Sequence, residues 1–323
     1  MRPDSPQLAL SAVKKTAVGR KARLPSVLLA IPRAPLLMIL PSFILTAVII
    51  GYPLLVLIWT SFHRVSHFGI VLSLNGIENY ISVLSDPLFL SSLWRTIIWT
   101  VAVTGGTVLA SVPLALMLND EFLGRDLARA IVLMPWSVSL TMTAVVWRWA
   151  LNGRAGLFNA TLMDFGILHQ PIEWLGTASR AFPIEILIGI AVSIPFTTIV
   201  LLGGLSSVAP SLYEAARIDG ASSWQLLQHI TLPLMRPFLN IAMVLNVIYV
   251  FNSFPIIWVM TEGGPANGTD ILVTYLYKLA FRFGQLGKAS VISLMMFIIL
   301  LAVTTLYVVL QSRKAEPDVG GTA

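Results

Sequence analysis

The chain has 323 residues, of which 56% are hydrophobic and only 11% are charged. A soluble domain usually carries about 25% charged residues, so this composition excludes an ordinary soluble fold and indicates a protein whose solvent is lipid. The absence of cysteine excludes a disulfide framework and a thiolate metal site, and the formal charge of +6 does not indicate nucleic acid because the basic residues form no single stripe.

A basic tail, residues 1–33, precedes the first apolar segment. Seven of the Lys and Arg residues lie in it. Such a tail is typical of the cytoplasmic side of a first transmembrane helix. It is too long and too charged for a signal peptide, and no small-residue cleavage motif follows the apolar run. We therefore expect a cytoplasmic tail at 1–33, a transmembrane domain at 34–312 and a second cytoplasmic tail at 313–323.

Six segments are apolar enough to cross a membrane. A helix needs about 20 apolar residues to cross the hydrocarbon layer of ~30 Å. None of the six contains Asp, Glu, Lys or Arg, each of which costs about 2.5–3.5 kcal/mol at the bilayer centre. The expected spans are 36–60, 96–118, 130–147, 186–205, 237–260 and 289–310. The sequence thus predicts an all-α integral membrane fold with about six transmembrane helices.

The orientation follows from the distribution of Lys and Arg. With the N-terminus inside, 13 of them lie on the inner side and 8 on the outer side. Because inner loops carry the excess of positive charge, both termini are predicted to be cytoplasmic. Five of the apolar segments carry a proline inside or near an end, where a helix kinks.

The connection 206–236, between the fourth and fifth spans, contains signals for two short helices. The sequence Ser-Leu-Tyr-Glu at 211–214 is a capping-box pattern, and Gly220 suits the left-handed residue that ends a helix. Ser-Ser-Trp-Gln at 222–225 is a second start signal, and Pro233 is expected to stop that helix. We predict a helix, a sharp turn and a helix on the cytoplasmic face.

This pair of helices could bind one of three kinds of partner, namely DNA, a lipid surface or another protein. Arg217 is the only basic residue between Ser206 and Pro233 other than His229, which argues against DNA reading. A helix resting on lipid would need a polar face rich in Lys and Arg. A helix of small residues, with Glu214 and Asp219 at its ends, fits a groove in another protein better.

The letters and spacing of this connection resemble a known motif. Glu214-Ala-Ala-x-x-Asp-Gly220, then nine residues, then Ile230-x-Leu232-Pro233 is similar to the "EAA" loop of binding-protein-dependent ABC importer permeases. The stretches 74–80, 147–149, 156–159 and 261–265 also resemble the sugar-type members of that family. The chain is most similar to the first of the two permeases in a maltose-type pair, and it matches least before residue 34.

The resemblance implies a type I ABC importer permease in the bacterial inner membrane. It implies a heterodimer with a second permease, two cytoplasmic ABC ATPase subunits, and a periplasmic solute-binding protein that delivers the solute. ATP and Mg²⁺ would be bound by the ATPases, since this chain lacks a G-x-x-x-x-G-K-[ST] loop, and we expect it to be no enzyme and to hold no cofactor. The residues that the motif assigns to ATPase coupling are Glu214, Ala215, Ala216, Asp219, Gly220, Ile230, Leu232 and Pro233.

Polar residues inside the fourth and fifth spans indicate a substrate path. Asn246, Tyr249 and Ser253 recur at i, i+3 and i+7, and an aromatic ring with hydroxyl and amide groups suits a sugar. The resemblance extends the path to Gly189, Val192, Ser193, Phe196, Asn246, Tyr249, Val250 and Ser253. Relatives can be polar where this chain has Gly189 and Val250, which leaves open another solute or a site mostly in the partner permease. Hydrogen bonding between helices is the alternative role of each polar residue.

The favoured cargo is a sugar or glycoside. A polyol, glycerol phosphate or an anionic sugar is the alternative within the same class. An ion-coupled secondary transporter is less favoured, because such carriers keep ionisable groups in the membrane and the six segments have none. His63 and His67 are four residues apart, but no third ligand is evident, so we predict no metal site. The sequence leaves open whether the two ATPase subunits are identical.

Overall fold

The structure is a computed structural model that describes residues 33–315 and the side chains of residues 37–311. Residues 1–32 of the predicted N-terminal tail lie outside the described residues. Residues 316–323 of the predicted C-terminal tail also lie outside them. The chain divides into two units, residues 1–55 and residues 56–323.

The first unit contains the start of a long apolar helix. Its elements are α1 (Arg33–Thr46), the π-helical turn η2 (Ala47–Gly51) and the beginning of α2 (Tyr52–Ser61), which continues into the second unit. Together they form a candidate span, Leu37–Ser61, and none of its most apolar stretch is buried. A helix that is apolar on all sides is typical of a segment surrounded by lipid or by other helices.

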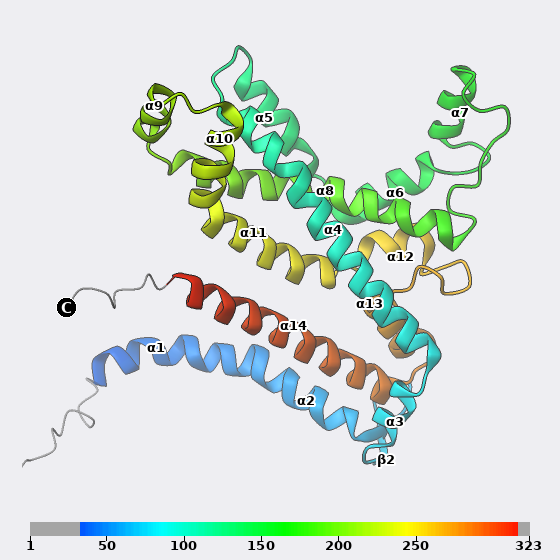
Figure 1. The fold of residues 1–323 in the computed structure, drawn as a ribbon. Helices are drawn as coiled ribbons and strands as arrows, with labels where there is room; N and C mark the ends of the chain where they lie inside the picture. The colour runs from blue at the N-terminus through cyan, green and yellow to red at the C-terminus, as the bar shows by residue number, and fades with distance from the viewer. Residues whose placement is uncertain (1–32, 316–323) are drawn as a thin grey trace, which may run out of the picture. The chain divides into compact units, whose positions relative to one another are not determined.

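The second unit contains a β-hairpin, long helices and short connecting helices (Figure 1). They are β1 (His63–Val65), β2 (Val71–Leu74), α3 (Glu78–Leu84), α4 (Pro87–Asn119), α5 (Arg125–Leu133), the 3₁₀ turn η3 (Met134–Ser137), α6 (Leu140–Ala150), α7 (Leu157–Asp164), α8 (Ala178–Ser206), α9 (Pro210–Ile218), α10 (Ser223–Leu226), η4 (Leu227–Thr231), α11 (Leu232–Phe251), α12 (Pro255–Thr261), α13 (Leu272–Tyr277), η5 (Lys278–Arg282) and α14 (Leu286–Ala315).

Five helical segments of the described residues are long and apolar enough to cross a membrane. They are Leu37–Ser61, Pro87–Asn119, Ala178–Ser206, Ser223–Thr261 and Leu286–Gln311. A sixth crossing exists only if Arg125–Ser137 and Leu140–Ala150, which meet at 93°, count as one broken span. The prediction of about six helices is therefore confirmed, and the segment predicted at 130–147 is divided between two helices that meet at a sharp bend.

The bend has a local cause. Pro135 lies in the 3₁₀ turn η3, where it cannot donate to an α-helical ladder. Ser139 then begins a new helix, because its side chain accepts a hydrogen bond from the backbone N–H of Met142. The chain therefore stops one helix and starts another inside a stretch that is apolar throughout.

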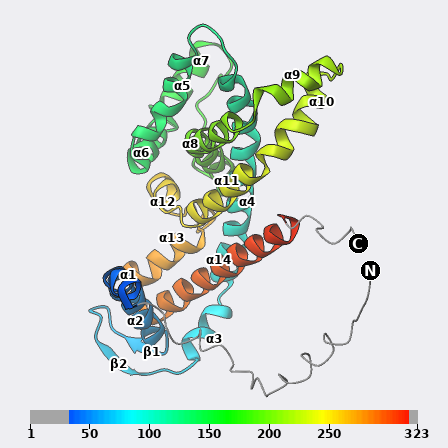
Figure 2. The ribbon, with the colours of Figure 1, turned by 90° about the vertical axis from the view of Figure 1, so that its left-hand side faces the viewer.

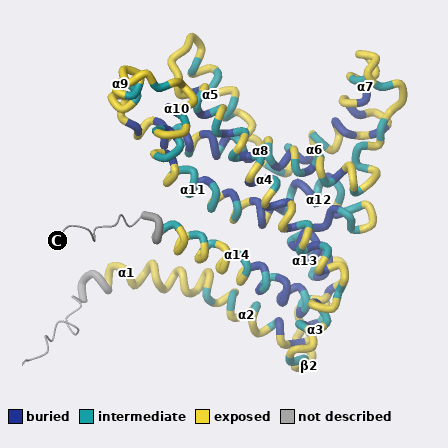
Figure 3. Tube along the Cα trace, viewed as in Figure 1, coloured by how far each residue is buried: buried dark blue, intermediate teal, exposed yellow. Residues whose placement is uncertain are grey.

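Helices α4, α8 and α11 pack together at the centre of the second unit, where their facing sides are buried (Figure 3). A Cβ atom on Gly189 would lie 3.0 Å from the ring of Trp99, so α8 and α4 approach closely there. The indole of Trp99 donates to the backbone oxygen of Val250 at 2.9 Å, which joins α4 to α11. Small residues and buried hydrogen bonds of this kind are how membrane helices associate.

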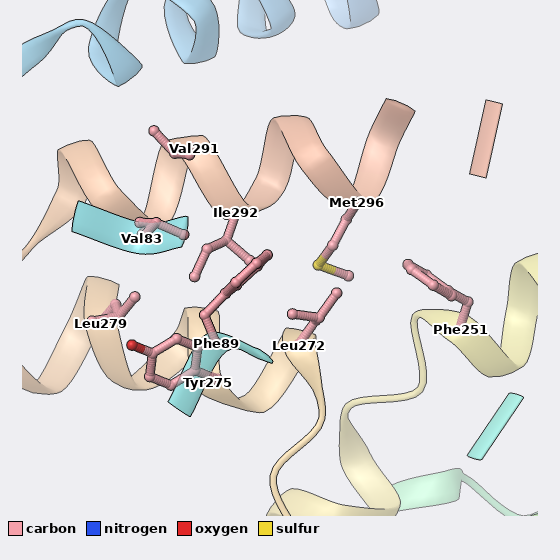
Figure 4. Packing of buried hydrophobic residues seen from close by; sticks show 10 residues of the cluster. Val83, Phe89, Phe251, Leu272, Tyr275, Leu279, Val291, Ile292 and Met296 are labelled. Carbon is pink, nitrogen blue, oxygen red and sulfur yellow. The ribbon is translucent and has the colours of Figure 1, made fainter. Parts of the chain in front are cut away.

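A second cluster of buried residues joins the start of α14 to α13 and α3. Figure 4 shows Ile292 and Met296 of α14 pointing toward α13, with Leu272 opposite them. Val83 of α3 belongs to the same cluster. The side-chain amide of Asn79 donates to backbone oxygens at the start of the hairpin, at 2.9 and 3.0 Å. The hairpin, α3 and the first turns of α14 thus form one packed region.

Candidate functional site

The connection between α8 and α11 folds as helix, turn and helix, as predicted. Figure 2 shows α9 and α10 where α8 ends and α11 begins. Gly220 follows α9 with φ of +80°, a conformation that a residue with a Cβ atom resists. Ser222 and Gln225 form the predicted capping box at the start of α10, each side chain bonding to the backbone of the other.

Two details of the local prediction are wrong. Helix α9 starts at Pro210 after Ala209, with no side-chain cap, so the pattern at 211–214 is no capping box. The reason is that proline at the first helical position has a φ already suited to the helix and lacks an N–H that would otherwise be unpaired there. Pro233 does not stop the second helix either. The π-helical turn η4, in which Leu232 N–H donates to the oxygen of Leu227, carries the chain past this proline into α11.

The turn encloses a shallow hollow of about 270 Å³. Four of the predicted coupling residues, Ala216, Asp219, Gly220 and Ile230, lie around it. The hydroxyls of Tyr213 on α9 and Thr231 in η4 lie 3.1 Å apart, within hydrogen-bond distance. This contact joins α9 directly to the turn from which α11 starts, so a displacement of α9 also acts on α11.

The other predicted coupling residues lie outside the hollow. Glu214 and Ala215 are exposed on α9, and Leu232 and Pro233 are half-buried at the start of α11. The sequence-based assignment missed two large apolar side chains beside the turn, Ile218 and Trp224, which are 86% and 64% exposed. Apolar residues in a connection between two spans were the available signal, because exposed apolar surface outside the lipid indicates a protein contact.

The predicted substrate-path residues of α11 do not share one environment. Asn246 is only 2% exposed, and its amide donates to Thr197 Oγ1 of α8 at 2.8 Å and to the oxygen of Ala242 at 2.9 Å. Val250 is buried with it on the same helix. Ser253 is also buried, but it follows the end of α11 at Phe251, so the predicted helical face does not extend to it. Tyr249, in contrast, is 49% exposed. Asn246 thus makes the helix-to-helix contact, whereas Tyr249 is about half exposed.

The predicted residues of α8 are divided in the same way. Gly189 and Ser193 are buried, and the hydroxyl of Ser193 donates to the backbone oxygen of Gly189 at 2.8 Å. Val192 and Phe196 are half-buried. The ring of Phe196 lies 6.1 Å from that of Trp136 in η3. The accessible part of the predicted path therefore comprises Tyr249 on α11 and the half-buried Val192 and Phe196 on α8.

Comparison with known proteins adds the family. The family model for the binding-protein-dependent transport system inner membrane component matches residues 106–316. A probable ABC transporter permease protein of Brucella suis is 53% identical over 87% of this chain and 98% of its own length. The trehalose/maltose transport system permease protein MalF of Thermococcus litoralis is 37% identical over 84% of this chain and 91% of its own.

Two further matches concern cargo names and fold. The sulfoquinovosyl glycerol transport system permease protein SmoG of Agrobacterium fabrum is 32% identical over 84% of this chain and 88% of its own. A chain from the crystal structure of a bacterial ABC transporter involved in import of the acidic polysaccharide alginate is 21% identical, with a TM-score of 0.72 over 88% of this chain and 96% of that chain. This last likeness concerns the fold.

Proposed function

The chain belongs to the family of binding-protein-dependent transport system inner membrane components, and we propose that it is the membrane permease subunit of an ATP-driven importer for a sugar or glycoside. The names of the relatives support this cargo, since they include a trehalose/maltose and a sulfoquinovosyl glycerol permease. The alternative is a polyol, glycerol phosphate or an anionic sugar, and a relative named as an sn-glycerol-3-phosphate permease favours keeping it.

The assembly in this proposal has five parts. This chain pairs with a second permease, two ATPase subunits bind on the cytoplasmic side, and a periplasmic binding protein delivers the solute. ATP hydrolysis belongs to the ATPase subunits. Both termini and the α9–α10 turn are cytoplasmic, in the inner membrane of a bacterium, as the excess of Lys and Arg on that side supports.

The single observation that carries the coupling role is the turn at Gly220. Its left-handed glycine and the capping box behind it hold α9 and α10 at a fixed angle. The exposed Ile218 and Trp224 offer apolar anchors to a cleft in an ATPase subunit. The contact of Tyr213 with Thr231 then transmits a movement of the docked helix to α11, on which Tyr249 lies.

Transport by the reconstituted complex tests this proposal. The chain is co-expressed with its second permease and ATPase, placed in proteoliposomes, and supplied with the binding protein. We expect uptake of labelled trehalose or maltose only when both ATP and the binding protein are present. Labelled glycerol 3-phosphate tests the alternative cargo. Uptake driven by an ion gradient without ATP would overturn the proposal.

A further inference from the structure

A fully buried carboxyl group lies in α8, one turn before Gly189. Glu185 is 0% exposed, and its Oε1 accepts a hydrogen bond from Thr261 Oγ1 at 2.7 Å. Its other oxygen, Oε2, has no hydrogen-bond partner among the described residues. Burying an acid inside a membrane-spanning helix costs free energy, so a residue of this kind indicates a functional position.

The contact continues from Glu185 into the loop between α12 and α13, residues 262–271. The hydroxyls of Thr261 and Thr269 lie 2.7 Å apart, at the two ends of the loop. With the Thr261 proton on Glu185, the Thr269 hydroxyl is the donor to Thr261 Oγ1. Thr269 also bonds to the loop through its backbone, since its N–H donates to the oxygen of Gly263 at 3.1 Å. The two threonines therefore close the base of the loop, and Glu185 attaches that base to α8.

The interior of the loop is held by a buried ion pair. Lys278 Nζ lies 2.6 Å from Asp270 Oδ2 and donates to Asn267 Oδ1 at 2.9 Å. A Cβ atom on Gly263 would lie 1.7 Å from Asp270 Oδ1, so only glycine fits there. Burial raises the pKa of the Asp270 carboxyl, and the Lys278 ammonium opposes that rise. The loop is thus a packed body whose parts move together.

Two further bonds attach this body to α4. Arg95 Nε donates to the backbone oxygen of Asp270 at 2.8 Å. Thr96 Oγ1 accepts from the N–H of Leu272 at 2.8 Å. The attachment to α4 goes through backbone groups at the end of the loop, whereas the attachment to α8 uses the side chain of Glu185. The side chain of Glu185 is thus the hydrogen-bonded link between α8 and the base of the loop, beside the packing of Gly268 against Ala178 at the start of α8.

We propose that Glu185 is a positioning residue that fastens the loop 262–271 to α8, so that a displacement of this loop is transmitted to the helix that carries Val192 and Phe196. This inference rests on the proposed function, in which the α9–α10 turn is cytoplasmic. One span, Ser223–Thr261, separates that turn from the loop, which therefore faces the periplasm, where the binding protein docks. The hydrogen bond from Thr261 carries the transmission, because Oε1 is the only side-chain oxygen of Glu185 with a hydrogen-bond partner among the described residues.

The test uses the complete complex in proteoliposomes and measures ATP hydrolysis with and without the loaded binding protein. Glu185→Leu removes the acceptor and Thr261→Val removes the donor. Each should lower the stimulated rate of ATP hydrolysis at least about fivefold, which corresponds to the smallest free energy usually lost with a buried hydrogen bond. The unstimulated rate should stay as in wild type. Glu185→Gln keeps an oxygen that can accept the hydrogen bond from Thr261, so its stimulation should stay within about twofold of wild type.

Thr198→Val is the matched control on the same helix. The hydroxyl of Thr198 is also buried but has no hydrogen-bond partner among the described residues, so its removal should leave stimulation unchanged. Stimulation of Thr261→Val at the wild-type level, or of Glu185→Gln as low as that of Thr261→Val, would overturn the positioning role even where Glu185→Leu fails to assemble. A wild-type complex that the binding protein does not stimulate would instead refute the proposed function.

Discussion

Replacement of Gly220 by valine gives the most direct test of the coupling turn. An added Cβ atom would meet nothing within 4 Å, so the side chain causes no clash. The whole penalty comes from the backbone, whose φ of +80° costs an L-residue about 1–2 kcal/mol. That free energy corresponds to about a 5- to 30-fold shift away from the native turn. Helix α9 should then leave its angle to α10, while the spans stay folded.

The assay is co-purification of the ATPase with the permease, followed by ATP hydrolysis in the presence of the loaded binding protein. We expect both to fall for Gly220→Val, and less for Gly220→Ala, which lacks the branched side chain. Gly124→Val is the matched control, since Gly124 has φ of +89° and equally open surroundings but precedes α5. If Gly220→Val retains the ATPase and full stimulation, the docking role of this turn is refuted.

Three further results are expected. Because the chain lacks cysteine, an impermeant thiol reagent should label Phe68→Cys in intact cells but Ile218→Cys only after permeabilisation, and the reverse labelling would overturn the orientation. Lys278→Met should lower the melting temperature of the purified complex, since an unpaired buried Asp270 costs about 3–5 kcal/mol, and adding Asp270→Asn should restore part of the loss. Uptake should fall for Tyr249→Ala about 5- to 150-fold and less for Tyr249→Phe, which keeps the ring; unchanged uptake by both would show that this face contacts no solute.

Local chemistry explains which parts of the coupling turn could be predicted. A glycine after a run of helix formers and a Ser-x-x-Gln pattern are satisfied by neighbours only a few residues away, so Gly220 and Ser222 behave as expected. The start of α9 depends on a competition between two local signals, Pro210 and Ser211. Proline at the first helical position needs no cap, and it determines where the helix begins.

Tertiary packing explains the rest of the differences. Helical periodicity brings Asn246 and Tyr249 to neighbouring positions on α11, yet it does not say which of them another helix covers. The amide of Asn246 finds Thr197 on α8, and the ring of Tyr249 finds no such neighbour. The bend after Pro135 could not be predicted for a similar reason, because hydropathy measures how apolar a segment is and does not give the direction of the helix axis.

Glu185 is a charged residue that a prediction from uncharged apolar segments misses. The predicted fourth span begins at residue 186, directly after this charged residue. Helix α8, however, begins at Ala178 and contains Glu185. Glu185 is an ionisable group inside a span, so a lack of such groups does not exclude an ion-coupled carrier. Membership of the family of binding-protein-dependent transport system inner membrane components nevertheless favours an ATP-driven importer over an ion-coupled carrier. A carboxyl that is fully buried and bonded to Thr261 suits the proposed positioning role, since an ion-carrying group must be reached in turn from each side of the membrane.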